Sequence, residues 1–272
     1  MQLFTAEQLI DFHQQQFAFL EIEEQDNVLT IRFDRAERRN ALHPHMINEI
    51  GYALQYADST ASIWVVIIEA KGKVFCAGGD LKAMAGFVEP HDSTVPEPEE
   101  PILFNAMFSQ LHKPLIIKVE GDVYAGGFMF LAGATFVVAA DHIKLGLTEV
   151  KRGIYPMQVM AALLRVMPDR KVLDWCVRGY NLPVQQAHEY GLVTEVCPAA
   201  EVGERVTALI AELKQNSPTA IRFGLEAYAN IRPSQDEQEY LLEMLGKVIG
   251  SKDGQEGLRA FREKRKPNWK GE

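Results

Sequence analysis

The sequence contains only three cysteines in 272 residues, and no two of them form a CxxC pair. Cys76, Cys176 and Cys197 are therefore expected to be reduced thiols, not a disulfide framework or a zinc site. Long apolar runs are also missing, since no stretch approaches the ~18 uninterrupted apolar residues of a membrane span. Glu7 and Asp11 interrupt any N-terminal signal segment. These absences predict a cytoplasmic protein that does not act in a membrane.

An excess of basic charge is absent as well. Lysine and arginine total 28 against 37 acidic residues, which gives a net charge of −9 and an isoelectric point near 5.4. Binding to nucleic acid or to an anionic membrane needs a broad basic face, so neither is expected as the main partner. A local basic patch can still bind a phosphate group.

Several common site motifs are missing. The sequence has no GxGxxG, no GxSxG and no HExxH. Gly121 and Gly126 have the spacing of a phosphate-binding loop, but Gly127-Phe128 replaces the required Lys-Ser/Thr. His43 and His45 have no third metal ligand at a recognisable spacing. We therefore expect neither a metal nor a redox cofactor.

Two junctions where a predicted strand passes through glycines into a helix are the main positive feature. They are KVFCAGGDLKAM (73–84) and KPLIIKVEGDVYAGGFMFLA (113–132). The start of a helix has free backbone N–H groups and a positive dipole end, which suit an oxyanion. Ala77 and Gly126 can each present an N–H group to one point. The glycines could instead serve only tight turns and helix packing, and the spacing alone leaves both interpretations open.

Glu149 is the only carboxylate between Asp141 and Asp169, and Leu147 and Val150 flank it. Apolar flanks favour burial, and burial raises the pKa of a carboxyl group towards a value useful for proton transfer. A solvated surface charge is the plain alternative. An oxyanion cradle with one isolated carboxylate is the pattern of an enolate-forming site.

The hydrophobic pattern predicts an α/β fold. The expected elements are a short helix within 3–16, a hairpin over 17–33 with its turn at Asp26-Asn27, a helix over 41–56 and a strand over 63–68. Residues 89–101 hold four prolines and five acids and predict an exposed, mobile loop. After residue 200 only helices are expected, over 202–215, 218–230, 235–249 and 254–266. We divide the chain into a core, 1–200, and a helical region, 201–272.

Six stretches in this order resemble the crotonase, or enoyl-CoA hydratase/isomerase, superfamily. They are RAERRNALHPHMINEI (35–50), FCAGGDLKAM (75–84), KPLIIKVEGDVYAGG (113–127), LGLTEVKRGIYP (145–156), AHEYGLVTEV (187–196) and EGLRAFREKRKPNWKG (256–271). The resemblance implies a spiral of ββα units with a C-terminal helical trimerisation region. It also implies an acyl-CoA substrate and a homotrimer or homohexamer.

The resemblance assigns roles to individual residues. Ala77 and Gly126 match the oxyanion-hole donors, and Glu149 matches a catalytic glutamate. The coenzyme A site would include Ala41, Ala77, Gly78, Gly79, Asp80 and Gly126, with Phe261 and Lys264 reaching the nucleotide end, often across a subunit interface. Coenzyme A is then part of the substrate, and no separate cofactor is implied.

One position departs from the hydratase pattern. Hydratases of this family carry a second glutamate three residues beyond the oxyanion glycine, where this chain has Met129. Family isomerases manage with the glutamate matching Glu149 alone, so the resemblance favours double-bond isomerisation over or alongside hydration. Tyr124 matches an aromatic residue of the methylmalonyl-CoA decarboxylases, which makes decarboxylation one alternative. A non-catalytic acyl-CoA-binding protein is the other.

Overall fold

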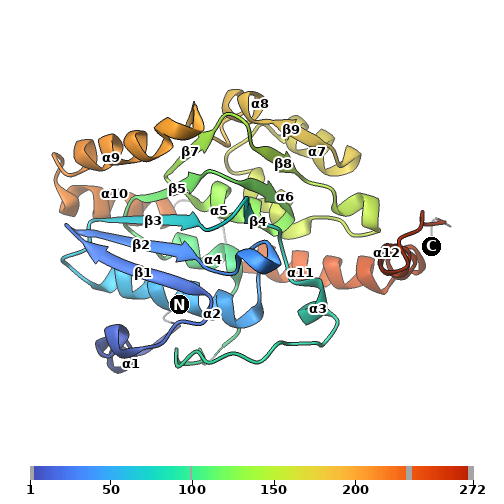
Figure 1. The fold of residues 1–272 in the computed structure, drawn as a ribbon, viewed down its shortest axis with the longest axis horizontal. Coiled ribbons are helices and arrows are strands. Elements are labelled where there is room, and N and C mark those ends of the chain that lie inside the picture. Colours follow the sequence, from blue (N-terminus) through green and yellow to red (C-terminus); the bar gives the residue numbers. More distant parts are fainter. Residues whose placement is uncertain (1–2, 99, 231–234, 269–272) are drawn as a thin grey trace.

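The structure, a computed structural model, describes residues 3–98, 100–230 and 235–268. Its larger sheet has the order β1-β2-β3-β5-β7-β10 (Figure 1). β1 pairs antiparallel with β2, and every other pair in this sheet is parallel. The strands are β1 (Leu20–Gln25), β2 (Val28–Phe33), β3 (Val65–Ala70), β5 (Leu115–Val119), β7 (Phe136–Ala140) and β10 (Glu195–Cys197).

A smaller sheet has the order β4-β6-β8-β9. Its strands are three residues each: β4 (Val74–Cys76), β6 (Asp122–Tyr124), β8 (Lys144–Gly146) and β9 (Asn181–Pro183). β4, β6 and β8 run parallel to one another, and β9 is antiparallel to β8. The first three strands therefore end on the same edge of the sheet.

Helices cover both sides of the larger sheet. α2 (Pro44–Ser59) packs below β1 and β2, whereas α9 (Val202–Leu213) packs above β5 and β7 (Figure 1). The remaining helices are α1 (Ala6–Ile10), α3 (Leu81–Met84), α4 (Phe104–Ser109), α5 (Phe128–Gly133), α6 (Met157–Leu163), α7 (Asp169–Arg178), α8 (Val184–Glu189), α10 (Pro218–Asn230), α11 (Gln235–Gly250) and α12 (Lys252–Arg262).

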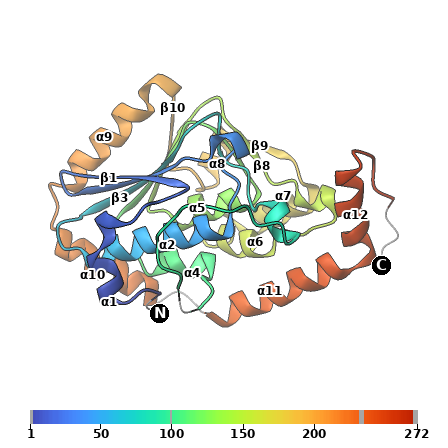
Figure 2. The same cartoon turned by 60° about the horizontal axis from the view of Figure 1, so that its bottom comes forward.

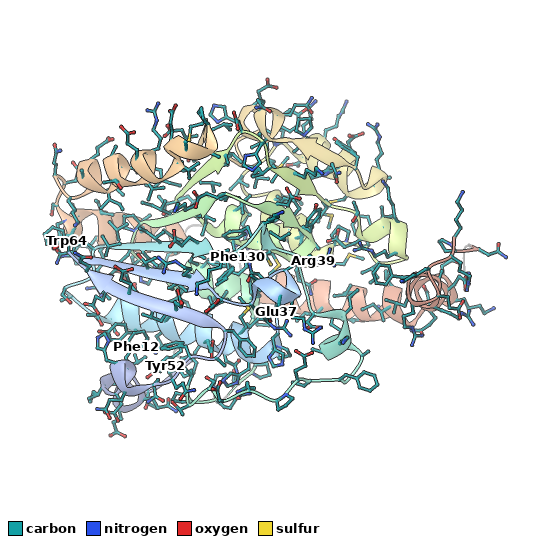
Figure 3. All side chains as sticks on the ribbon, in the orientation of Figure 1. Phe12, Glu37, Arg39, Tyr52, Trp64 and Phe130 are labelled. Carbon is teal, nitrogen blue, oxygen red and sulfur yellow. The ribbon has the colours of Figure 1, made fainter. Side chains whose placement is uncertain are left out.

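Aromatic side chains join the two sheets into one core. Phe33 of β2, Phe75 of β4 and Phe130 of α5 are fully buried, with ring centroids 5.0 to 5.9 Å apart. A second group, which includes Phe12 and Tyr52, packs the N-terminal segment onto α2 (Figure 3). Because these rings are removed from water, the small sheet is held firmly against the large one.

Several predicted elements are confirmed. Thr5 and Gln8 form the predicted capping box, and Asp26 and Asn27 form the hairpin turn with φ of 50° and 64°. The helix predicted over 41–56 is α2, shifted three residues towards the C-terminus because Pro44 occupies its first turn. The strand predicted over 63–68 is β3. The structure adds β6 and β7, which the pattern did not indicate.

The acidic loop has no helix or strand within residues 89–98, as expected, but it is anchored at several points. Val95 is buried, with 4% of its surface exposed. Three acids of the loop pair with the body of the protein: Glu89 with Arg35 (3.0 Å), Asp92 with Gln16 (2.6 Å) and Glu97 with His45 (2.8 Å). This segment is therefore attached more closely than its composition indicated.

Beyond Cys197, the part of the chain that the structure describes contains helices and the turns between them, but no strand. α11 extends along one side of the molecule and leads into α12 (Figure 2). The fold class is thus α/β with a helical C-terminal region. The division into two domains near residue 200 stays a prediction.

Candidate active site

The expected site residues follow the ends of three neighbouring strands. β4 ends at Cys76, β6 at Tyr124 and β8 at Gly146, and the three strands are parallel neighbours. The carboxyl ends of parallel strands are a common place for ligand sites, because the loops that follow them meet there. The sequence interpretation assigned Gly126 to the strand 115–119. The structure shows that β6, in the smaller sheet, delivers it.

The two glycine junctions touch each other. Gly78 has a φ of +86°, and a Cβ atom there would lie 2.5 Å from Ala125 Cβ and 3.1 Å from the Gly126 nitrogen. A Cβ atom at Gly126 would lie 3.7 Å from the Gly79 nitrogen. Only glycine fits position 78, for its backbone conformation and for the space available.

The hydrogen bonds decide which N–H groups are free. The Ala77 N–H donates to the Arg39 carbonyl at 3.0 Å (Arg39 is labelled in Figure 3), so it is not available for an oxyanion. Within the residues that the structure describes, the Gly79 N–H has no acceptor. Gly126 lies in the first turn of a 3-10 helix, Ala125–Gly127, where N–H groups have no intrahelical acceptor. The structure therefore offers Gly79 with Gly126, in place of the expected pair Ala77 and Gly126.

The segment around Ala41 joins this group through backbone hydrogen bonds. The Leu42 N–H donates to the Gly78 carbonyl at 2.8 Å, and the Asp80 N–H donates to the Leu42 carbonyl at 3.1 Å. Residues 41 and 77–80, expected at the coenzyme A site, are thus brought together with Gly126.

Asp80 has a structural environment. Its carboxylate caps α3 by accepting from the N–H groups of Lys82 and Ala83 and pairs with Arg35 at 2.8 Å. Although burial opposes ionisation, the arginine and the capping N–H groups hold the Asp80 pKa below its ordinary value. Arg35 is 2% exposed and also donates to the Ala41 carbonyl at 2.8 Å. The sequence interpretation did not single out Arg35, since nothing in its position signals burial.

Glu149 opens the 3-10 turn Glu149–Arg152 that follows β8. Its Oε2 atom is buried and has no hydrogen-bond partner within the described residues. Burial raises the pKa of the carboxyl group to about 7, against smaller opposing contributions from backbone N–H groups and Arg152. A group with this pKa at neutral pH can both accept and return a proton. Cys176 of α7 is close enough to be affected by the Glu149 charge. Burial, together with this charge, raises the pKa of the Cys176 thiol to about 12.

Met129 lies on α5, three residues beyond Gly126, and is 7% exposed. Its side chain lines a cavity of about 690 Å³ between α4, α5 and α10, whose described lining contains no Asp or Glu. The position expected for a second glutamate is therefore a buried methionine, and no other carboxylate of the described cavity lining takes its place.

The other predicted residues lie elsewhere or have other partners. Phe261 lies on α12, where its ring faces the Arg152 guanidinium of the same chain at 4.9 Å, and Lys264 follows that helix. The His43 side chain accepts from the His45 N–H at the start of α2. In the described part of the chain, no cluster of three or more His, Cys, Asp or Glu is arranged for a metal ion. The helices described there are all too short or too polar to cross a bilayer.

Comparison with known proteins identifies the family of this chain. The enoyl-CoA hydratase/isomerase family model matches residues 23–272. An enoyl-CoA hydratase of Mycobacterium tuberculosis is 32% identical over 253 residues, which cover 91% of this chain and 95% of that protein.

Solved structures agree with the sequence comparison. A carnitinyl-CoA hydratase from Mycobacterium avium superposes with a TM-score of 0.83 at 27% identity, covering 94% of this chain and all of the other. A methylmalonyl-CoA decarboxylase superposes with a TM-score of 0.78 at 25% identity over 94% of this chain and all of its own. The chain therefore belongs to the enoyl-CoA hydratase/isomerase family of the crotonase superfamily and is an enzyme that acts on acyl-CoA thioesters.

Proposed function

We propose that Glu149 is the single catalytic base of this enzyme, and that Gly79 and Gly126 stabilise an enolate of the bound thioester. The observation that carries the proposal is the buried Glu149 Oε2 atom, which has no hydrogen-bond partner in the part of the chain that the structure describes. It lies in the turn beyond β8, while the two free N–H groups follow the neighbouring strand ends. Each N–H donor of an oxyanion hole contributes about 3–4 kcal/mol to the transition state.

Double-bond isomerisation suits a site with one base. Glu149 removes a proton from C2 of a 3-enoyl thioester, and the electron pair of that C–H bond forms the dienolate. The negative charge on the thioester oxygen is held by the Gly79 and Gly126 N–H groups. Glu149 then returns the proton to C4, which leaves the double bond between C2 and C3. No metal or redox cofactor takes part, because only a proton moves.

Hydration is the second activity of the same proposal. Adding water to a 2-enoyl thioester needs a group that takes a proton from water and a group that protonates C2. Met129 can do neither, so Glu149 must serve both steps. We therefore expect hydration to be slower than isomerisation.

Decarboxylation is the alternative within the superfamily, and Tyr124 was its sequence support. The Tyr124 hydroxyl donates to the Asp122 carboxylate at 2.9 Å, and a Cβ at Gly146 would lie 2.6 Å from its ring. The hydroxyl is thus engaged beside the strand ends, and this contact favours a packing role. A non-catalytic role in acyl-CoA binding is disfavoured by the ionisable Glu149, whose Oε2 atom has no hydrogen-bond partner among the described residues.

A homotrimer or homohexamer remains part of the proposal. Large apolar side chains are exposed on the C-terminal helices, among them Phe223 and Tyr228 of α10, at 63% and 50%. Subunit contacts there would cover them.

Replacing Glu149 by Gln tests the assignment of the base. The change keeps the size of the side chain and removes its proton transfer, so both activities should fall about 10²- to 10⁴-fold. Glu204→Gln, at an exposed position of α9, is the matched control and should retain full activity. A Glu149→Gln protein with wild-type rates would exclude Glu149 as the base.

A further inference from the structure

The C-terminal helix α12 packs against the turn that carries Glu149. Both views show α12 beside the yellow-green turn that follows β8 (Figures 1 and 2), and the two elements are in contact. The contact is made through backbone atoms. A Cβ atom at Gly257 would lie 2.1 Å from the Arg152 carbonyl oxygen and 2.9 Å from the Gly153 nitrogen. No side chain larger than hydrogen fits unless the turn moves.

A second contact joins the same two elements. The Arg152 guanidinium lies 4.9 Å from the centre of the Phe261 ring, one helical turn beyond Gly257. A cation over an aromatic face contributes about 0.5–1 kcal/mol at an exposed site. Glu149 is the first residue of this turn and Arg152 is the last. The contact with Phe261 therefore attaches the C-terminal end of the turn to α12.

The opposite side of the turn is held by the end of α7. A Cβ atom at Gly179, where φ is +61°, would lie 2.7 Å from Val150 Cγ1. The turn itself closes through the Ile154 N–H, which donates to the Glu149 carbonyl at 3.2 Å. Glu149 thus lies on a four-residue turn that packs between α7 and α12.

We infer that α12 positions the catalytic base, and that Gly257 is the positioning residue through which it acts. The inference rests on the proposed role of Glu149. The helix presses the Arg152-Gly153 backbone into place, and this fixes where the Glu149 carboxylate points. A displacement of about 1 Å at a reacting group can cost about 10²-fold in rate. The same packing of α12 keeps water away from the Glu149 carboxylate, because a displaced turn would let water in beside it.

The experiment is Gly257→Ala, compared with Gly246→Ala in α11. Both sites are glycines inside helices, but a Cβ atom at Gly246 would meet no atom of the described residues within 4 Å. Both variants gain helix propensity, and only the first displaces the turn. For Gly257→Ala we expect kcat to fall about 10²-fold with KM within about threefold. Gly246→Ala should match the wild type in both.

The pH dependence of kcat/KM distinguishes a displaced Glu149 from a general loss of folded enzyme. Among the described residues, Arg152 on the turn and Cys176 on α7 are the charged or titratable groups coupled to the Glu149 carboxyl group. If the turn opens, water reaches the carboxylate and its apparent pKa in kcat/KM should fall from about 7 towards its ordinary value. A Gly257→Ala enzyme with unchanged kcat and pH profile would overturn the inference, whereas an active Glu149→Gln enzyme would overturn the proposed base itself.

Phe261→Leu keeps the inference testable if Gly257→Ala does not fold. This variant loses the contact with Arg152 without adding atoms. Its assay uses a pantetheine thioester, which lacks the nucleotide part of coenzyme A. A several-fold loss of kcat on this truncated substrate supports positioning through Arg152. Wild-type kcat on it would mean that Phe261 serves only nucleotide binding, and the inference would fail.

Discussion

At the scale of single residues, the proposed chemistry depends on the removal of the Glu149 carboxyl group from water. Its Oε2 atom has no hydrogen-bond partner among the described residues, and burial is the main reason why the pKa of the carboxyl group is raised to about 7. Asp80 is also partly buried, but Arg35 and two backbone N–H groups keep its pKa low. The pKa values of the two carboxyl groups therefore shift in opposite directions because their partners differ.

The pH dependence of activity follows from the Glu149 pKa. A base must be ionised, so kcat/KM should rise with pH through about 7 and then level off. Steady-state kinetics between pH 5 and 9 measures this limb. A plateau already reached at pH 5 would contradict a buried base.

Stability should show the opposite trend. The folded pKa lies above the unfolded value of about 4.5, so the folded state binds more protons between pH 4.5 and 7 and loses stability as pH rises through this window. The loss is up to about 3 kcal/mol. Glu149→Gln has no such titration, so urea unfolding should show it gaining on the wild type from pH 5 to pH 8. Equal pH dependence in the two proteins would show that Glu149 is hydrated.

At the scale of elements, the site is created by the contact between two loops. The Gly78 backbone lies against Ala125 and Gly126, and this contact sets the distance between the two N–H donors.

Gly78→Ala should separate these loops. The added Cβ would lie 2.5 Å from Ala125 Cβ, so we expect kcat to fall about 10²-fold. Gly86→Ala is a close control, because Gly86 has nearly the same φ, +87°, and a Cβ atom there would meet none of the described atoms within 4 Å. In both variants an alanine at a positive φ lowers the free energy of unfolding by about 1 kcal/mol, which thermal unfolding measures. Equal activities of the two would contradict the role of the contact.

Much of this arrangement could be predicted from the sequence. Hydrophobic period indicated α2, the β1–β2 hairpin and the C-terminal helices, and the glycine junctions indicated the oxyanion site. β6 was not predicted, because three residues are too few to show a period of two. Residues 136–140 form β7 as a short apolar run, which periodicity cannot separate from a buried helix.

The choice between Ala77 and Gly79 could not be made from the sequence. It depends on one hydrogen bond to Arg39, a residue 38 positions earlier in the chain. Such a long-range bond leaves no local pattern. The attachment of the acidic loop to the body of the protein could not be predicted for the same reason, since the partners of the loop are distant residues such as Arg35 and Gln16.

At the scale of the whole molecule, the sheets and the C-terminal helices act on the site together. The parallel strands β4, β6 and β8 bring Gly79, Gly126 and Glu149 to one edge of the smaller sheet. α12 then returns from the end of the chain to the turn of Glu149. The proposed preference for isomerisation depends on three features together: the position of Glu149, the pair of N–H groups at Gly79 and Gly126, and the apolar Met129.

The most direct measurement is a paired assay of one purified protein. It follows conversion of a 3-enoyl-CoA to its 2-enoyl isomer and, separately, hydration of crotonyl-CoA, in the wild type and in Met129→Glu, with Met129→Gln as the uncharged control. We predict that wild-type isomerisation exceeds hydration at least about tenfold, and that Met129→Glu alone raises hydration by a similar factor, since a second proton-transfer group contributes about 10²-fold or more where it is well placed. Hydration equal to or faster than isomerisation in the wild type would contradict a mechanism with Glu149 as its only base.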